Sequence, residues 1–145
     1  MSMKSILIAV APNDSPVVSA IVGTEFNVVM CHTLREAEAN LKDNIGLIAC
    51  GVHFDHGNMF ELLRAAKANQ ATRSVPFFLV LKENTSHSPA VIHGIRCAGE
   101  LLGVDLFIDL SALSADADIQ VRYEKVRQIA REALLTSALP HDDEL

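Results

Sequence analysis

The stretch Ile48-Ala-Cys-Gly-Val-His-Phe-Asp-His-Gly-Asn-Met-Phe-Glu-Leu-Leu63 joins an apolar run to a helical pattern through a polar loop. The run, residues 46–51, shows no alternation of polar and apolar side chains, which is typical of a strand covered on both faces. After the loop, Asn58 precedes Glu61 by three residues, the spacing of a capping box. Apolar residues then fall on one side of a helix: Met59, Phe60, Leu62, Leu63 and Ala66. A buried strand followed by an amphipathic helix is one unit of an α/β sheet.

The same unit recurs along the chain. Apolar runs that predict strands cover residues 5–11, 26–31, 46–51, 75–81 and 106–108. Helices are expected between them: a short one over residues 16–22, one that begins after Thr33 with a capping box to Glu36, and one from Ser88-Pro89 to Gly103. The pattern predicts an α/β fold, a doubly wound five-stranded parallel sheet with helices on both faces, of the flavodoxin-like type.

A last helix is expected to start at Ser114, with Asp116 and Asp118 favouring its N-terminal dipole. Its sheet-covering face should carry Ile119, Tyr123, Val126, Ala130 and Ala133. No linker precedes residue 137, so we expect one domain over residues 1–136 and a solvated acidic tail over residues 137–145.

Composition excludes several classes of protein. The 145 residues carry 18 acidic and 12 basic side chains, a net charge of −6, which argues against a nucleic-acid partner because phosphate binding needs a basic surface. No apolar stretch approaches a membrane span, so no membrane partner is expected. Cys31, Cys50 and Cys97 lie far apart in apolar runs, which predicts buried thiols and a cytoplasmic, reducing compartment.

Three segments in order carry a resemblance to a known family. Residues 48–63, then Ser74-Val-Pro-Phe-Phe-Leu-Val80, then Gly103-Val-Asp-Leu-Phe-Ile108 look like the receiver domain of two-component response regulators, and the similarity covers about residues 4–135. The resemblance implies a CheY-like fold and a signalling role. It also implies catalysed self-phosphorylation, in which an aspartate after the third strand takes the phosphoryl group and an acidic pair after the first strand holds Mg²⁺.

The residues at those positions depart from the family's pattern. The phosphoacceptor position falls on Gly51, the hydroxyl position after the fourth strand on Leu81, and the lysine position after the fifth strand on Leu110. The acidic pair falls near Val10 and Ala11. We therefore expect a degenerate receiver, or pseudo-receiver, that has no catalytic residues and no cofactor, is not an enzyme, and signals independently of phosphorylation.

Such a domain must act through protein–protein contacts. The resemblance points to a protein partner or a homodimer through the fourth helix, the fifth strand and the fifth helix. Candidate interface residues are Ile92, His93 and Arg96, expected on the outer face of the fourth helix, and Phe107, where many receivers have an aromatic switch residue. A purely structural partner subunit fits the same sequence.

A second interpretation uses the polar loop after the third strand. His53, Asp55 and His56, together with Asp14, Asp109, Glu83 and His87, could ring the carboxyl edge of the sheet. Imidazoles and carboxylates are good transition-metal ligands, so the chain could be a small metal-binding or ligand-binding protein or an enzyme. A hydrated loop that caps the helix after Asn58 explains the same residues, and the spacing matches no zinc signature. Whether these side chains converge on one pocket distinguishes the two.

Overall fold

The computed structural model describes residues 4–82, 88–110 and 118–138. A five-stranded parallel sheet lies at its centre, made of β1 (Ser5–Ala9), β2 (Val28–Cys31), β3 (Ile45–Gly51), β4 (Phe77–Leu81) and β5 (Leu106–Asp109). The strand order is β2-β1-β3-β4-β5. This is the flavodoxin-like order, and it confirms the fold class expected from the apolar runs.

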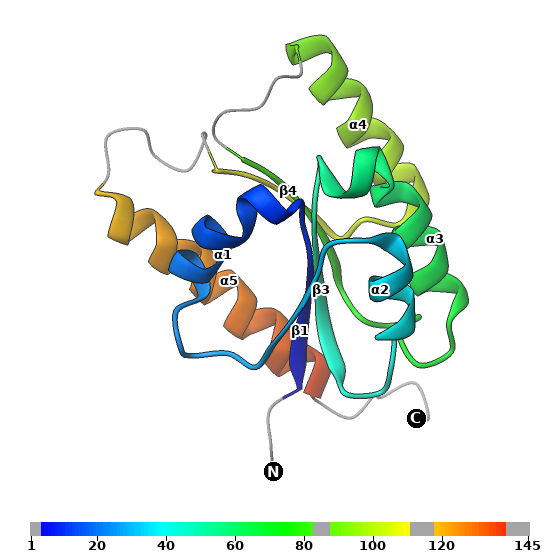
Figure 1. Ribbon diagram of the computed structural model, residues 1–145, viewed down its shortest axis with the longest axis horizontal. Helices are drawn as coiled ribbons and strands as arrows, with labels where there is room; N and C mark the ends of the chain where they lie inside the picture. The colour runs from blue at the N-terminus through cyan, green and yellow to red at the C-terminus, as the bar shows by residue number, and fades with distance from the viewer. Residues whose placement is uncertain (1–3, 83–87, 111–117, 139–145) are drawn as a thin grey trace.

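Helices cover both faces of the sheet. They are α1 (Ser15–Val22), α2 (Leu34–Ala39), α3 (Met59–Ala68), α4 (Pro89–Leu102) and α5 (Ile119–Ala138), with short 3₁₀ turns η1 (Pro12–Asp14) and η2 (Phe54–Gly57). Figure 1 shows α1 and α5 on one side of the sheet and α2, α3 and α4 on the other. None of these helices is long and apolar enough to cross a membrane.

The core consists of two apolar layers, one on each face of the sheet. Ile6, Ile8 and Val10 pack with Ala130 and Leu134 of α5 in the layer that we call the α1/α5 layer. The alternate residues of β1 join the layer below α2, α3 and α4, which we call the α2–α4 layer and which contains Leu7 and Ala9. Because successive side chains of a strand point to opposite faces, burial on both explains the continuous apolar run.

Most of the expected helix ends are present. Thr33 and Glu36 form the complete capping box at α2, the Ser88 side chain accepts a hydrogen bond from the Val91 amide at α4, and Gly103 ends α4 with φ of 106°. Asn58 does not form the expected capping box, because its side chain makes no capping hydrogen bond. The chain enters α3 through a turn that leaves Asn58 at φ −80° and ψ 18°, whereas a capping residue is normally extended.

Three expectations about exposure and helix bounds were wrong or only partly met. The helix α5 begins at Ile119, later than expected, while Ser114 and Asp116 lie outside the described residues. Ile119 is 43% exposed, whereas Leu134, which was not expected on the sheet-covering face, is buried. The helix continues to Ala138, and residues 139–145 of the expected tail lie outside the described part. Cys97 is exposed, whereas Cys31 and Cys50 are buried as expected.

Candidate functional site

The carboxyl ends of the parallel strands meet at one edge of the sheet, and the strand order reverses between β1 and β3. Open α/β sheets bind ligands at such a switch point. Here the edge carries Gly51, which ends β3, and Val10, which follows β1 and is buried. A Cβ atom built on Gly51 would lie 3.3 Å from Val10 Cγ1, so any side chain at position 51 would press against Val10. The two positions that the receiver resemblance assigns to the phosphoacceptor and the acidic pair are therefore neighbouring and apolar.

A small cavity of about 80 Å³ lies beside this contact, within the α1/α5 layer. Its walls come from α1, α5 and the strands, and they include Val10, Gly51, Val80 and Leu110. No polar atom contributes to its surface. Leu81, at the position that the resemblance assigns to the hydroxyl side chain, is buried in the opposite α2–α4 layer. The positions at which a receiver has polar groups thus belong to the hydrophobic core or line an apolar cavity.

These residues do not fit the Mg²⁺ ion that receivers use. Such a site needs carboxylate oxygens after β1 and β3, and the chain has Val10, Ala11 and Gly51 there. Asp14, the nearest carboxylate after β1, lies at the end of η1 with its Oδ1 3.5 Å from Lys82 Nζ. That ion pair connects the turn after β1 to the end of β4.

His32 also lies at this edge, a position that no sequence motif predicted. The side chain follows β2, and its Nδ1 lies 2.9 Å from the carbonyl oxygen of Val10. Because a carbonyl can only accept, Nδ1 donates this hydrogen bond, and Nε2 lies 3.3 Å from the Ser15 hydroxyl oxygen. His32 therefore ties β1, β2 and the start of α1 together. In the sequence, His32 directly follows an apolar run. A residue in that position is expected at the carboxyl edge of a parallel sheet.

The loop after β3 has an unusual backbone. Asp55 and His56 have φ angles of 41° and 57°, in the left-handed region that non-glycine residues seldom adopt, and Gly57 follows with φ of 89°. The Asp55 carboxylate accepts a hydrogen bond from the Leu34 amide at 2.8 Å, at the N-terminal end of α2. Phe54, fully buried in the α2–α4 layer, anchors the other side of the turn. Burial and this hydrogen bond hold the loop in its strained conformation.

The hydrogen bond from the Leu34 amide is the main cause that lowers the pKa of Asp55. Desolvation opposes it in part, and the Asn58 side chain and the His56 ring add smaller lowering effects. A carboxylate with a lowered pKa stabilises the folded state above its unfolded pKa of about 3.9, and this contribution is lost as the pH falls through the folded value.

We expect Asp55→Asn to lower the melting temperature at neutral pH, and the difference from the wild type to shrink as the pH falls below about 4. Asn also tolerates the left-handed conformation, so the substitution tests the charge rather than the backbone. In NMR spectra the Leu34 amide shift should titrate with Asp55 in the wild type and not in the variant. A pH-independent Leu34 shift in the wild type would contradict the role given to this carboxylate.

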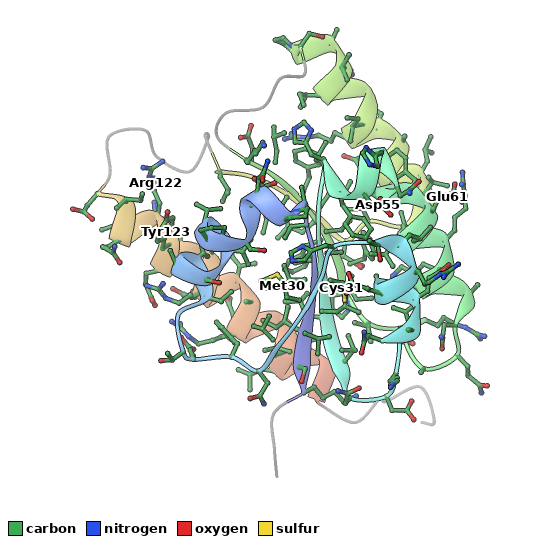
Figure 2. The ribbon with its side chains drawn as sticks, in the orientation of Figure 1. Met30, Cys31, Asp55, Glu61, Arg122 and Tyr123 are labelled. Carbon is green, nitrogen blue, oxygen red and sulfur yellow. The ribbon has the colours of Figure 1, made fainter. Side chains whose placement is uncertain are left out.

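The structure does not bring the polar side chains expected at the carboxyl edge of the sheet together at one point. Asp55 faces α2, as Figure 2 shows, and Asp14 faces Lys82 from the turn before α1. Asp109 ends β5 opposite Leu81, and His56 is exposed. Within residues 4–82, 88–110 and 118–138, no three His, Cys, Asp or Glu side chains are arranged to hold a metal ion. Glu83 and His87 lie outside the described residues, and half-buried His53 directly precedes η2.

The candidate interface residues separate into two groups. His93 and Arg96 are exposed on α4 as expected, and the Arg96 guanidinium lies over the Phe107 ring of β5, 4.6 Å from its centroid. Ile92 was expected on the outer face but is half-buried and packs against the α2–α4 layer. It shares the sheet-facing side of α4 with Ile95 and Gly99, which are three and seven residues further on.

Comparisons with known proteins agree with this architecture. The Mn(2+)-bound form of response regulator Rcp1 is similar with a TM-score of 0.65 and 21% identity, over 95% of this chain and 99% of that one. A response regulator from Hahella chejuensis gives 0.68 and 14%, over 94% and 99%. The chemotaxis protein CheY4 of Vibrio cholerae gives 0.64 and 16%, over 90% and 99%. No protein-family model and no curated protein sequence matches the chain. The chain therefore has the fold of response-regulator receiver domains.

Proposed function

We propose that this chain is a receiver-like signalling domain that works without aspartyl phosphorylation and acts by docking to another protein or to a second copy of itself. The observation that carries the proposal is Gly51 at the end of β3, beside the apolar cavity. Phosphorylation of a receiver needs a carboxylate nucleophile at this position, and glycine has no side chain to react. The proposal assigns no enzymatic activity to the edge.

The neighbouring residues support this inference. Val10 and Leu110 line the same cavity, and Leu81 is buried in the opposite layer, so none supplies an oxygen or nitrogen to a phosphoryl group. Lys82, the cation one residue past Leu81, is paired with Asp14. Transfer of a phosphoryl group depends on positioned charges that neutralise the transferred oxygens. At the positions where receivers have these groups, this chain has apolar side chains.

The exposed residues of α4, β5 and α5 support the docking part of the proposal. Arg96 and Phe107 border a shallow hollow of about 340 Å³, and aromatic residues and arginine are enriched in protein interfaces. Each of the three elements also exposes large apolar side chains: Leu101 and Leu102 on α4, Leu106 on β5, and Ile119, Val121 and Leu135 on α5. β5 lies at the edge of the sheet, with β4 as its neighbour.

The free thiols of Cys31 and Cys50 favour a reducing compartment, and we place the proposed function in the cytoplasm.

The direct test is incubation with acetyl phosphate and Mg²⁺, followed by intact-mass measurement. We expect no phosphoryl adduct under conditions that fully phosphorylate an ordinary receiver domain treated in parallel. A stoichiometric adduct that peptide mapping places on Asp14, Asp55 or Asp109, and that the matching Asp→Asn variant loses, would overturn the phosphorylation-independent function.

A further inference from the structure

The outward-facing side of α4 carries a histidine and a cysteine, two residue types that can bind metal ions, next to small and apolar residues. Ile92, Ile95 and Gly99 face the sheet, and a Cβ atom on Gly99 would lie 3.2 Å from Leu79 Cδ1 of β4, which fixes the rotation of the helix. The opposite side therefore carries His93, Cys97 and Leu101, which are spaced by four residues. All three are exposed, Leu101 by 88%. Figure 1 shows α4 on the outside of the molecule.

The two potential ligands already have the separation that a metal ion requires. Cys97 Sγ lies 3.5 Å from His93 Nε2. In a tetrahedral zinc site, bonds of about 2.3 Å to sulfur and about 2.05 Å to nitrogen place these two atoms about 3.6 Å apart. Binding of an ion between them would therefore leave this separation almost unchanged and would require the imidazole ring and the thiol to turn towards the ion. Thiolate and imidazole together suit zinc and related divalent transition metals.

One copy of the chain supplies only half of such a site. In the described part of the chain, no third His, Cys, Asp or Glu joins this pair in a metal-binding group. Structural zinc sites have four protein ligands, and a two-fold axis through the ion would supply the same His and Cys from a second copy. The remaining residues of the outward-facing side of α4 permit this approach. Ala90 and Gly94 are small and exposed, a Cβ atom on Gly94 would meet nothing within 4 Å, and Leu101 offers apolar surface to bury.

We propose that His93 and Cys97 form half of a site for a divalent transition-metal ion of the zinc class, and that two copies of the chain share one ion across their α4 helices. On binding, each Cys97 thiol releases its proton to solvent and forms a sulfur–metal bond, and each neutral His93 donates its Nε2 lone pair, with no change in oxidation state. The inference rests on the proposed use of α4 as a docking surface and narrows the partner to a second copy.

The test is a titration of the reduced full-length chain with Zn²⁺, with a phosphine reductant present so that no disulfide forms. Molar mass from light scattering should change from monomer to dimer, with one ion bound per two chains. Co²⁺ in place of Zn²⁺ should give the thiolate-to-metal charge-transfer absorption and the intense visible bands of a tetrahedral site. Cys97→Ser and His93→Ala should each lose the dimer at metal concentrations that saturate the wild type. Both positions are exposed, so the variants should retain the wild-type circular dichroism spectrum.

The matched control is His56→Asn, which removes an exposed histidine outside α4 and should leave the metal-dependent dimer unchanged. One ion bound per monomer, a dimer that a chelator does not dissociate, or wild-type metal binding by Cys97→Ser would each overturn the inference. The outcome is independent of the acetyl phosphate experiment. If the chain accepts no phosphoryl group and forms no metal-dependent dimer, only the shared-ion proposal fails. If the chain dimerises with zinc and also forms a phosphoryl adduct, only phosphorylation independence fails.

Discussion

Gly51→Asp is expected to lower the free energy of unfolding by about 2–4 kcal/mol at about pH 8, without making the protein reactive towards acetyl phosphate. The new Cβ atom would lie 3.3 Å from Val10 Cγ1, and the carboxylate would enter a cavity whose surface contains no polar atom. An unpaired charge in apolar surroundings is costly because it loses its hydration and gains no partner. Introducing a nucleophile at position 51 alone therefore destabilises the fold and does not supply the other groups that phosphorylation needs.

The penalty should depend on pH with a definite sign. Burial raises the pKa of the introduced carboxyl above its unfolded value of about 3.9. The part of the destabilisation that comes from the charge is thus absent below the unfolded pKa and grows as the pH rises above it. Urea unfolding of Gly51→Asp, compared with Gly51→Ala from about pH 8 down to about pH 4, measures this difference. The alanine variant makes the same contact with Val10 without the charge, and we expect it to remain within about 1 kcal/mol of the wild type. Equal stability of the two variants at about pH 8 would show that the edge can accommodate a carboxylate.

Phe54→Ala should cost about 3–5 kcal/mol, the range for removing a large buried aromatic side chain. Phe54 is completely buried and precedes the two left-handed residues Asp55 and His56. Its loss would leave a cavity in the α2–α4 layer and remove the anchor that holds the strained turn. Urea unfolding measures the first effect, and faster hydrogen exchange of the Leu34 amide, which donates to Asp55, reports the second.

Phe54→Leu is the matched variant, since it keeps an apolar side chain and should cost about 1–2 kcal/mol. Its Leu34 amide should stay protected. A cost below about 1 kcal/mol for the alanine variant would mean that the loop does not depend on this anchor.

The fold was predictable because its signals are local and redundant. The central strands β3 and β4, and β1 after Ser5, are uninterrupted apolar runs. The cap at Ser88 and the left-handed Gly103 define α4 through side-chain and backbone preferences that act within a few residues. The receiver resemblance added the expectation that Gly51, Leu81 and Leu110 stand at positions where receivers have polar groups. Leu81 is buried, and Gly51 and Leu110 line an apolar cavity, as the side-chain types of these residues alone predict.

Other features depend on tertiary contacts that no short segment encodes. Asn58 has the capping-box spacing, but its backbone is set by the left-handed turn before it. The hydrogen bond of His32 to Val10 joins residues 22 positions apart. The rotation of α4, which turns Ile92 inward and exposes Cys97, follows from the close packing of Gly99 on β4. The polar loop suggested convergence on one point, whereas Asp55 satisfies an amide of α2.

The contact between Val10 and Gly51 also constrains how this sequence can change. A carboxylate at either position alone would face the apolar side chains around the cavity without a counter-charge, so each single substitution passes through a less stable protein. The benefit of a working phosphorylation site would come only after several residues had changed together. Selection acts on one substitution at a time, and proteins lie close to their stability threshold. The apolar edge therefore makes any single introduction of a carboxylate at these two positions costly.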